Sequence, residues 1–419
     1  MRILIWHGYL LGGTGSNVYT RSLARTWARQ GHDVVVLCQD PHPEEVDLGG
    51  AQVVRPQLPG RLPVFVLDHY DDAEPVLLGD MAPDERDVFV AANAAALRAE
   101  LPADLVLVNH VLLGGPVGAA AGAPFVVKAH GSELEFAMRG APDLQTWARD
   151  SLASATAVLA GSRHIVDVLE DVVGPGEHRD RVEVLPPGVD VDHLRPRPRE
   201  EALAGLIAEC RLDPPNPPTA HDERRPDPRN AERLASFLAG EAPTVLYVGK
   251  ISAEKGVPLL LDALGTIDAR AVIVGFGPAR AELEAAAGDR VLFTGPLEHR
   301  HLAHLWPLAD VAVTPSVFPE AFGMVAAEAA ACGCPPLVAR HSGLAEVAAQ
   351  LELAYPPELA HLAGFERGDR DDLRAKLTAL LSLTADDRRR VSEAARAVAV
   401  EAWSWERVAE RIAALAGPR

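Results

Sequence analysis

Short apolar runs alternate with helix-like segments in both halves of the chain. In the first half, an apolar run at residues 2–6 precedes a glycine-rich loop, a helical segment at 16–30 and a second apolar run at 34–38. Further apolar runs occupy residues 105–108, 125–127, 157–159, 182–185, 244–248, 271–274, 291–293, 311–314 and 336–339. This alternation is typical of parallel sheets covered by helices. It predicts an α/β fold of two Rossmann-like, doubly wound parallel-sheet domains that face a cleft.

The composition changes between the two series. Pro, Arg, Asp and Glu dominate residues 196–243, as in the PPNPP run at 214–218, which predicts a linker or a mobile insertion. We therefore expect an N-terminal domain over residues 1–190, a linker with a Pro- and charge-rich insertion over 191–243, a C-terminal domain over 244–400 and a terminal segment over 401–419.

The uncharged stretch 105–127 is nearly long enough to span a membrane. Asn109, His110, Pro116 and several glycines interrupt it. These residues predict a buried strand, a turn of small residues and another buried strand, and no integral membrane association.

Charge and cysteine content exclude several classes of protein. The 419 residues include 59 acidic and 40 basic side chains, a formal net charge of -19, without a basic run. Such a surface repels nucleic acids and anionic lipids. Four cysteines are too few for a disulfide framework, and the first residues lack the features of a signal peptide. We expect a cytoplasmic protein with reduced thiols.

Two lysines mark the loop after the first strand of the second domain. Only four lysines occur against 36 arginines, and Lys250 and Lys255 fall in this one loop, at the mouth of the predicted cleft. Two compact cations suit a diphosphate. An ordinary solvated turn is the alternative interpretation.

Residues 319–328 follow a strand and lead into a predicted helix. A helix that starts near Phe322 would direct its free backbone N–H groups at a phosphate. Glu328, about two turns into that helix, could accept hydrogen bonds from ribose hydroxyls, and Glu320 could hold the hydroxyls of a sugar. A helix-capping acid and a solvent-facing glutamate would explain the same residues.

Glycines and histidines mark the first domain. The Gly12-Gly13-Thr14-Gly15 loop can bring backbone close to a phosphate or sugar. Val18 replaces the third glycine of a dinucleotide fingerprint, which disfavours a nicotinamide-dependent enzyme. His130 and His7 each end a predicted strand on the cleft side, where a structural role and a functional role are both open.

Two short motifs resemble metal sites. Asp190 and Asp192 have the spacing that chelates a metal-diphosphate in some transferases, but they lie just before the predicted linker. Cys332 and Cys334 have no second ligand pair nearby, which favours small buried residues over zinc. The sequence predicts no metal site.

Together these motifs resemble the family-4 retaining glycosyltransferases of the GT-B architecture. The resemblance rests on segments in both halves: Gly12–Gly15, Ser22–Ala24, Gly31–Val34, His130–Ser132, Pro187–Asp190, Gly249–Gly256, Glu320–Glu328 and Trp403–Glu406. It implies that the terminal segment forms a helix that crosses back to the N-terminal, acceptor-side domain.

The resemblance also implies roles for individual residues. Lys250 and Lys255 would bind the donor diphosphate, His130 would contact the transferred sugar, and Glu320 would hold donor-sugar hydroxyls. The remaining implied donor contacts are backbone at Gly12, Gly13, Phe322, Gly323, Met324 and Val325, the ribose at Glu328 and the nucleobase at Leu297. The family usually has arginine where Lys250 stands, and lysine lacks the bidentate fork of arginine.

The function implied by the resemblance is retaining, metal-independent transfer of a hexosyl or amino-hexosyl group from a nucleoside-diphosphate sugar. We favour a UDP-sugar over a GDP-sugar, expect no separate cofactor, and expect a small soluble acceptor. Acidic residues at 68, 71, 72, 74, 80, 84, 85 and 87 suggest a cationic acceptor such as an aminocyclitol, although a solvated acidic loop is the better explanation of them. A nucleotide-sugar epimerase and a non-catalytic nucleotide-binding subunit are the alternative functions.

Overall fold

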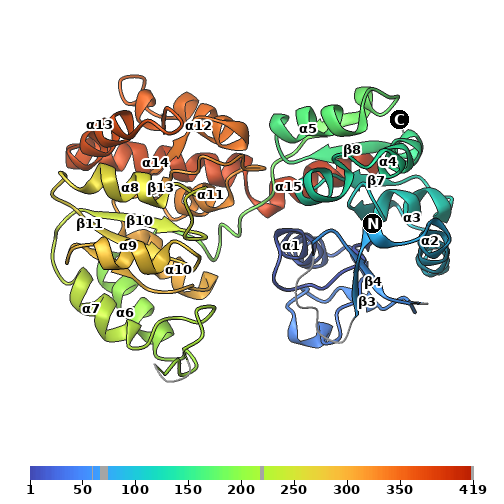
Figure 1. The fold of residues 1–419 in the computed structure, drawn as a ribbon, viewed down its shortest axis with the longest axis horizontal. Coiled ribbons are helices and arrows are strands. Elements are labelled where there is room, and N and C mark those ends of the chain that lie inside the picture. Colours follow the sequence, from blue (N-terminus) through green and yellow to red (C-terminus); the bar gives the residue numbers. More distant parts are fainter. Residues whose placement is uncertain (59, 67–73, 218–220, 417–419) are drawn as a thin grey trace. The chain divides into compact units, whose positions relative to one another are not determined.

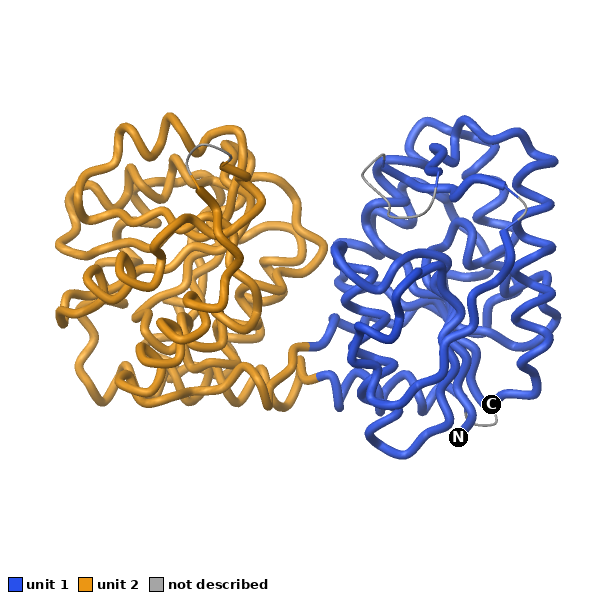
Figure 2. The backbone as a smooth tube through the Cα atoms, turned by 90° about the horizontal axis from the view of Figure 1, so that it is seen from below, with its two compact units in different colours: residues 1–188, 405–419 blue, residues 189–404 orange. Residues whose placement is uncertain are grey.

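The chain forms two compact units in a computed structural model, which describes residues 1–58, 60–66, 74–217 and 221–416. Unit 1 consists of residues 1–188 and 405–419, and unit 2 of residues 189–404 (Figure 2). The chain therefore passes twice between the units, once after Gly188 and once after Ser404.

Unit 1 is built on a seven-stranded parallel sheet with the order β3-β2-β1-β6-β7-β8-β9. Ile3 of β1 pairs with Val34 of β2 and with Leu105 of β6. The strands are β1 (Arg2–Trp6), β2 (Asp33–Leu37), β3 (Gln52–Val54), β6 (Leu105–Asn109), β7 (Val126–Lys128), β8 (Ala157–Ala160) and β9 (Val182–Val184), and a separate pair joins β4 (Leu62–Val64) to β5 (Pro75–Leu77).

Helices cover both faces of this sheet (Figure 1). One apolar core contains Trp27 of α1 and Trp405 of α15, and the core on the other face contains Phe89 of α2 and Leu152 of α4. The helices are α1 (Gly15–Arg29), α2 (Pro83–Ala99), α3 (Gly114–Ala121), α4 (Pro142–Ser154), α5 (Arg163–Val173), α15 (Trp405–Ala413) and the π-helix η3 (Glu133–Met138).

Unit 2 contains a six-stranded parallel sheet with the order β12-β11-β10-β13-β14-β15 and one continuous core. Its strands are β10 (Thr244–Val248), β11 (Arg270–Val274), β12 (Val291–Phe293), β13 (Val311–Thr314), β14 (Pro336–Ala339) and β15 (Gly364–Phe365). Its helices are α6 (Arg199–Cys210), α7 (Asn230–Leu238), α8 (Val257–Leu264), α9 (Arg280–Ala286), α10 (His299–Leu305), α11 (Met324–Ala331), α12 (Ser342–Ala354), α13 (Arg370–Leu381) and α14 (Ala385–Ala402). The α/β prediction of two doubly wound parallel sheets is confirmed.

Two segments differ from the sequence prediction. Residues 105–127 contain the helix α3 where a simple turn was expected. The small residues of α3 allow close packing, since a Cβ on Gly118 would lie 2.6 Å from the Phe125 ring. Residues 191–243 were expected to be a linker or insertion, yet α6 and α7 lie in this range and their apolar faces, including Leu206 and Leu234, join the core of unit 2.

The C-terminal helix α15 packs within unit 1. Trp27 Nε1 donates a hydrogen bond to the Ala409 carbonyl at 3.1 Å, and the Trp405 and Tyr19 ring centroids lie 5.4 Å apart. A Cβ on Gly188 would overlap the Trp405 ring, at 2.3 Å. Searched over the described residues, none of the helices is long and apolar enough to cross a membrane.

Candidate functional site

The loop after β10 carries both lysines selected from the sequence. Lys250 is exposed and Lys255 is partly buried. Tyr247 Oη donates to the Lys250 carbonyl at 2.8 Å, and the Val317 N–H from the loop after β13 donates to the Glu254 carbonyl at 2.9 Å. These bonds hold the loops after β10 and β13 together in unit 2.

Lys255 and Glu320, 65 residues apart in the sequence, form an ion pair in unit 2. Lys255 Nζ lies 2.5 Å from Glu320 Oε1, and the two side chains are 31% and 24% exposed. The Glu320 N–H donates to Ser342 Oγ at 2.9 Å, which fixes the backbone beside the carboxylate. The structure thus brings together the ammonium predicted for the diphosphate and the carboxylate predicted for the sugar.

The helix α11 begins at Met324, two residues later than expected, with Gly323 as its N-cap. Phe322 precedes the helix, and its ring lies edge-on to Trp403 at 5.7 Å. Among the described residues, no side chain caps this helix, and its first turn contains no acid. Its first backbone N–H groups are therefore available to an anion, starting at Gly323, Met324 and Val325.

Glu328 lies only about one turn into α11, because the helix starts later than predicted, so the estimate of two turns is wrong. Its carboxylate is 10% exposed, and its Oε1 lies 3.1 Å from His299 Nε2 of α10. An almost buried carboxylate oriented by an imidazole can accept hydroxyl donors. The sequence did not identify His299 as its partner.

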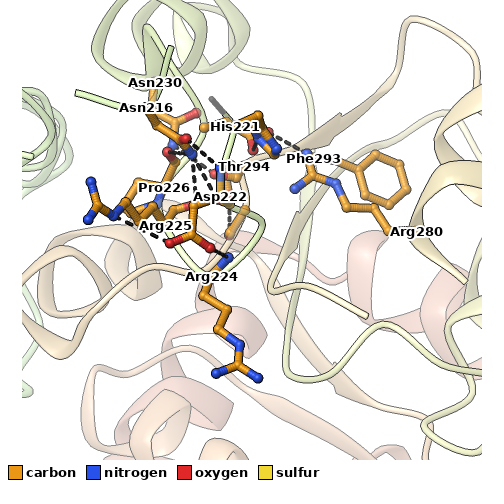
Figure 3. A network of polar contacts seen from close by, with 12 residues as sticks. Asn216, His221, Asp222, Arg224, Arg225, Pro226, Asn230, Arg280, Phe293 and Thr294 are labelled. Atoms are coloured by element: carbon orange, nitrogen blue, oxygen red, sulfur yellow. Dashed lines mark hydrogen bonds and ion pairs between the residues drawn. The ribbon is translucent and has the colours of Figure 1, made fainter. Parts of the chain in front are cut away.

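Leu297, the predicted nucleobase contact, is buried at 9% exposure just after β12. Residues of the segment that was predicted to be an insertion bind Thr294, three residues before Leu297. The Asp227 N–H and Asn230 Nδ2 donate to the Thr294 carbonyl at 2.9 and 2.8 Å. Asn216 closes the segment on itself by donating to the Pro226 carbonyl at 3.0 Å (Figure 3). The insertion is thereby attached to the strand end that leads to Leu297.

The glycine loop of unit 1 precedes α1. Gly12 and Gly13 are exposed, and the helix starts at Gly15. Asn17 Nδ2 donates to the Gly12 carbonyl, and Asn17 Oδ1 lies 2.8 Å from His7 Nε2. Burial lowers the pKa of His7 to about 3. His7 is therefore uncharged at neutral pH, and it supports the glycine loop through Asn17. The sequence did not identify Asn17.

His130 follows β7 in the same unit. Its Nε2 lies 3.0 Å from Asn109 Oδ1, while Asn109 Nδ2 donates to Thr20 Oγ1 at 3.2 Å. Burial is the main cause that holds the pKa of His130 well below its usual range. His130 is thus uncharged at neutral pH, with Nε2 as the donor to Asn109.

Lys128 at the end of β7 makes a testable contribution to stability. It is 3% exposed, and burial lowers its pKa from 10.5 to about 7. Between these values the unfolded chain binds more protons than the folded chain, so the stability that depends on Lys128 rises with pH. We expect Lys128→Met to stabilise the chain most at pH 7 and below, with the gain shrinking by about 1.4 kcal/mol per pH unit above that.

Urea unfolding of wild type and Lys128→Met at pH 7, 8.5 and 10 checks this expectation. A difference in unfolding free energy that does not change with pH would contradict it.

The remaining sequence candidates differ in their surroundings. Asp190 Oδ1 accepts the His193 N–H at 3.0 Å, and Asp192 is exposed. The four cysteines are buried free thiols. Residues 68, 71 and 72 lie outside the described residues, and the described acids at 74, 80, 84, 85 and 87 are exposed. Asp84 and Glu85 belong to the first turn of α2, where acids stabilise a helix.

Cys210, Asp213 and His301 form a cluster with metal-ligand atoms within 4.8 Å of one another. His301 Nδ1 accepts the Glu298 N–H at 3.2 Å, so its proton resides on Nε2, which lies 3.0 Å from Asp213 Oδ1. An Nε2 that carries a proton has no lone pair for a metal. Arg300 also binds Asp213, so the hydrogen bonding favours a structural role.

Two family models match the chain: "Glycosyltransferase Family 4" matches residues 13–193, and "Glycosyl transferases group 1" matches residues 228–398. A D-inositol 3-phosphate glycosyltransferase of Xylanimonas cellulosilytica is 34% identical over 208 residues, 47% of this chain and 43% of that protein. A GDP-mannose-dependent alpha-(1-6)-phosphatidylinositol dimannoside mannosyltransferase of Mycobacterium tuberculosis is 43% identical over 110 residues, 25% of this chain and 29% of that protein. The matches thus span less than half the length of these relatives.

Solved structures match nearly the whole chain. Anabaena HepE in complex with UDP has a TM-score of 0.67 at 19% identity and covers 99% of both chains. Sucrose-phosphate synthase from Thermosynechococcus elongatus has a TM-score of 0.65 at 21% identity and covers 99% of this chain and 98% of its own. Because the two family models together match most of the sequence, the chain belongs to glycosyltransferase family 4 and has the GT-B fold.

Proposed function

We propose that the chain transfers a hexosyl or amino-hexosyl group from a nucleoside-diphosphate sugar to a hydroxyl of a small soluble acceptor. The observation that carries the proposal is the Lys255–Glu320 ion pair. Glu320 lies three residues before Gly323, the N-cap residue of α11, and no described side chain caps this helix. A cation and free N–H groups suit a diphosphate, and a carboxylate suits sugar hydroxyls.

In this proposal, the chain catalyses transfer by stabilising the negative charge that develops on the leaving diphosphate. Lys250, Lys255 and the first N–H groups of α11 stabilise that charge. Glu320 orients the sugar, Glu328 binds the ribose, and Leu297 contacts the base. Lys250 acts as a point charge, since it lacks the paired donors of an arginine.

We propose a UDP-sugar donor in preference to a GDP-sugar, with transfer that retains the anomeric configuration and needs no metal. HepE has been solved with UDP-glucose, which supports the choice of base, whereas the mycobacterial relative is named as GDP-mannose-dependent. NMR of the product anomer tests retention. Transfer is expected to persist after treatment with EDTA, and an activity restored only by a divalent ion would contradict metal independence.

The acceptor in our proposal is a small polyhydroxylated molecule. The acidic stretch supplies little support for a cationic one, because its described members are exposed or belong to the first turn of α2. An acceptor screen should therefore include neutral and amine-bearing sugars and cyclitols beside phosphatidylinositol. Best activity on the lipid would contradict a soluble acceptor.

Glu328→Ala tests the ribose contact. A hydrogen bond to a charged group contributes about 1.5–3 kcal/mol, so we expect the affinity for the preferred nucleoside diphosphate to fall about tenfold or more. Pyrophosphate, which has no ribose, should bind unchanged. Isothermal titration measures both, with Glu282→Ala on the exposed face of α9 as the control. An equal loss for the two ligands would contradict the ribose assignment.

Titration with UDP, GDP and ADP, followed by donor turnover with and without acceptors, tests the whole proposal. A glycosyltransferase binds one nucleotide and transfers its sugar only to an acceptor or slowly to water. Conversion of the donor sugar without an acceptor would indicate an epimerase, and binding without turnover a non-catalytic subunit.

A further inference from the structure

His110 lies at the carboxyl end of β6, among the groups around His130. Its N–H donates to the Lys128 carbonyl at 2.9 Å, and its carbonyl accepts the Gly115 N–H at 3.1 Å. Its φ of 71° is unusual for a residue with a side chain. These constraints hold the imidazole at the end of the sheet where ligands of parallel α/β folds bind.

Glu133 fixes the orientation of this imidazole. Its carboxylate is fully buried and accepts from the Val111 N–H at 2.9 Å and the His130 N–H at 3.0 Å. His110 Nδ1 makes a short contact with the same carboxylate. A carboxylate held by two backbone donors acts as an acceptor, so Nδ1 of His110 is the atom that carries the proton. In the neutral imidazole, Nε2 is then left with a lone pair.

Nε2 of His110 is buried and has no hydrogen-bond partner in the part of the chain that the structure describes. Other rings pack around the imidazole: the His110 centroid lies 4.9 Å from that of Phe65, 5.3 Å from that of Tyr9 and 4.6 Å from that of His130. A buried acceptor without a partner is unfavourable. The arrangement leaves one acceptor atom on an imidazole that Glu133 holds through Nδ1 and that the rings of Phe65, Tyr9 and His130 neighbour.

We propose that His110 Nε2 accepts a hydrogen bond from a hydroxyl group of the acceptor, a sugar or cyclitol ring, and that Glu133 is its positioning residue. The inference rests on the proposed function, which it extends by assigning an acceptor contact in unit 1. A ring hydroxyl supplies the missing donor, and the flanking aromatic rings suit the apolar C–H face of a polyhydroxylated ring. Neither residue was selected from the sequence.

Two substitutions at His110 separate binding from structural support. The short amide of His110→Asn can keep an N–H near the Nδ1 position, toward Glu133, and removes the acceptor at Nε2. The longer amide of His110→Gln can place an oxygen near the Nε2 position. We expect His110→Asn to raise the acceptor KM by about tenfold, the loss of one well-placed hydrogen bond, and His110→Gln to raise it less. Donor affinity should stay unchanged in both variants.

A purely structural role predicts the opposite order, because Asn preserves the contact with Glu133. An acceptor KM for His110→Asn equal to or below that of His110→Gln would therefore overturn the inference. His42→Asn, at an exposed histidine of the same unit, is the control. The acceptor probes are myo-inositol, glucosamine, glucose and mannose.

NMR of the full chain labelled with 15N-histidine gives a readout that needs no acceptor. We expect a protonated Nδ1 and an unprotonated Nε2 for His110, assigned by its loss in His110→Asn, and a changed pattern in Glu133→Gln. A protonated Nε2 would overturn the inference. This test applies even if the wild type glycosylates none of the acceptor probes. Failure to bind any nucleotide in the titration would instead contradict the proposed function.

Discussion

Lys255→Ala is expected to lower the transfer rate by about 10²- to 10³-fold, because it removes a fixed cation from the leaving diphosphate. The fold should persist, since the Lys255–Glu320 pair is partly exposed and such pairs add about 0–1 kcal/mol. Single-turnover transfer and urea unfolding measure the two effects.

Lys376→Ala is the matched control for this variant. Lys376 belongs to α13 of the same unit and has no place in the proposed site. Near-normal transfer by Lys255→Ala, or an equal loss in Lys376→Ala, would remove the diphosphate assignment.

Gly275→Ala is expected to abolish nucleotide binding and destabilise unit 2. Gly275 follows β11 with a φ of 135°, and an added Cβ would lie 1.9 Å from the Gly249 carbonyl oxygen. The unfavourable backbone conformation alone costs about 1–3 kcal/mol. Relief of the overlap requires Gly249 to move, and with it the neighbouring Lys250. Urea unfolding and isothermal titration with UDP and GDP test this prediction.

The control for the glycine variant is Gly288→Ala. Gly288 belongs to the same unit, and an added Cβ there meets no atom within 4 Å. Retention of wild-type affinity by Gly275→Ala would show that the loop after β10 does not need this close backbone approach.

The apolar runs of the sequence identified most of both sheets because buried parallel strands are continuously apolar. Short edge strands such as β3 and β15 carry too little of that pattern. The helices α6 and α7 were missed because the prolines and most of the charged residues of 196–243 lie outside these helices and dominate the composition of the segment, although Leu206 and Leu234 are buried. For α3, tight packing of small residues outweighs the low helix propensity of glycine.

Sequence reasoning found the candidate groups that lie within one short segment, such as the lysines of the loop after β10. It did not find partners that the fold brings from other elements, such as His299 for Glu328 and Asn17 for His7. His110 ends an apolar strand just as His130 does, and that signal could have identified it. Its carboxylate partner, 23 residues later, becomes evident only when β6 and η3 are folded together.

A crystal structure of the chain bound to whichever of UDP, GDP and ADP binds most tightly tests the central claim most directly. We predict the diphosphate within hydrogen-bonding distance of Lys255 Nζ and of the first backbone N–H groups of α11, with the ribose hydroxyls on Glu328. A diphosphate bound elsewhere on the chain, without contact to Lys255 or α11, would contradict the account.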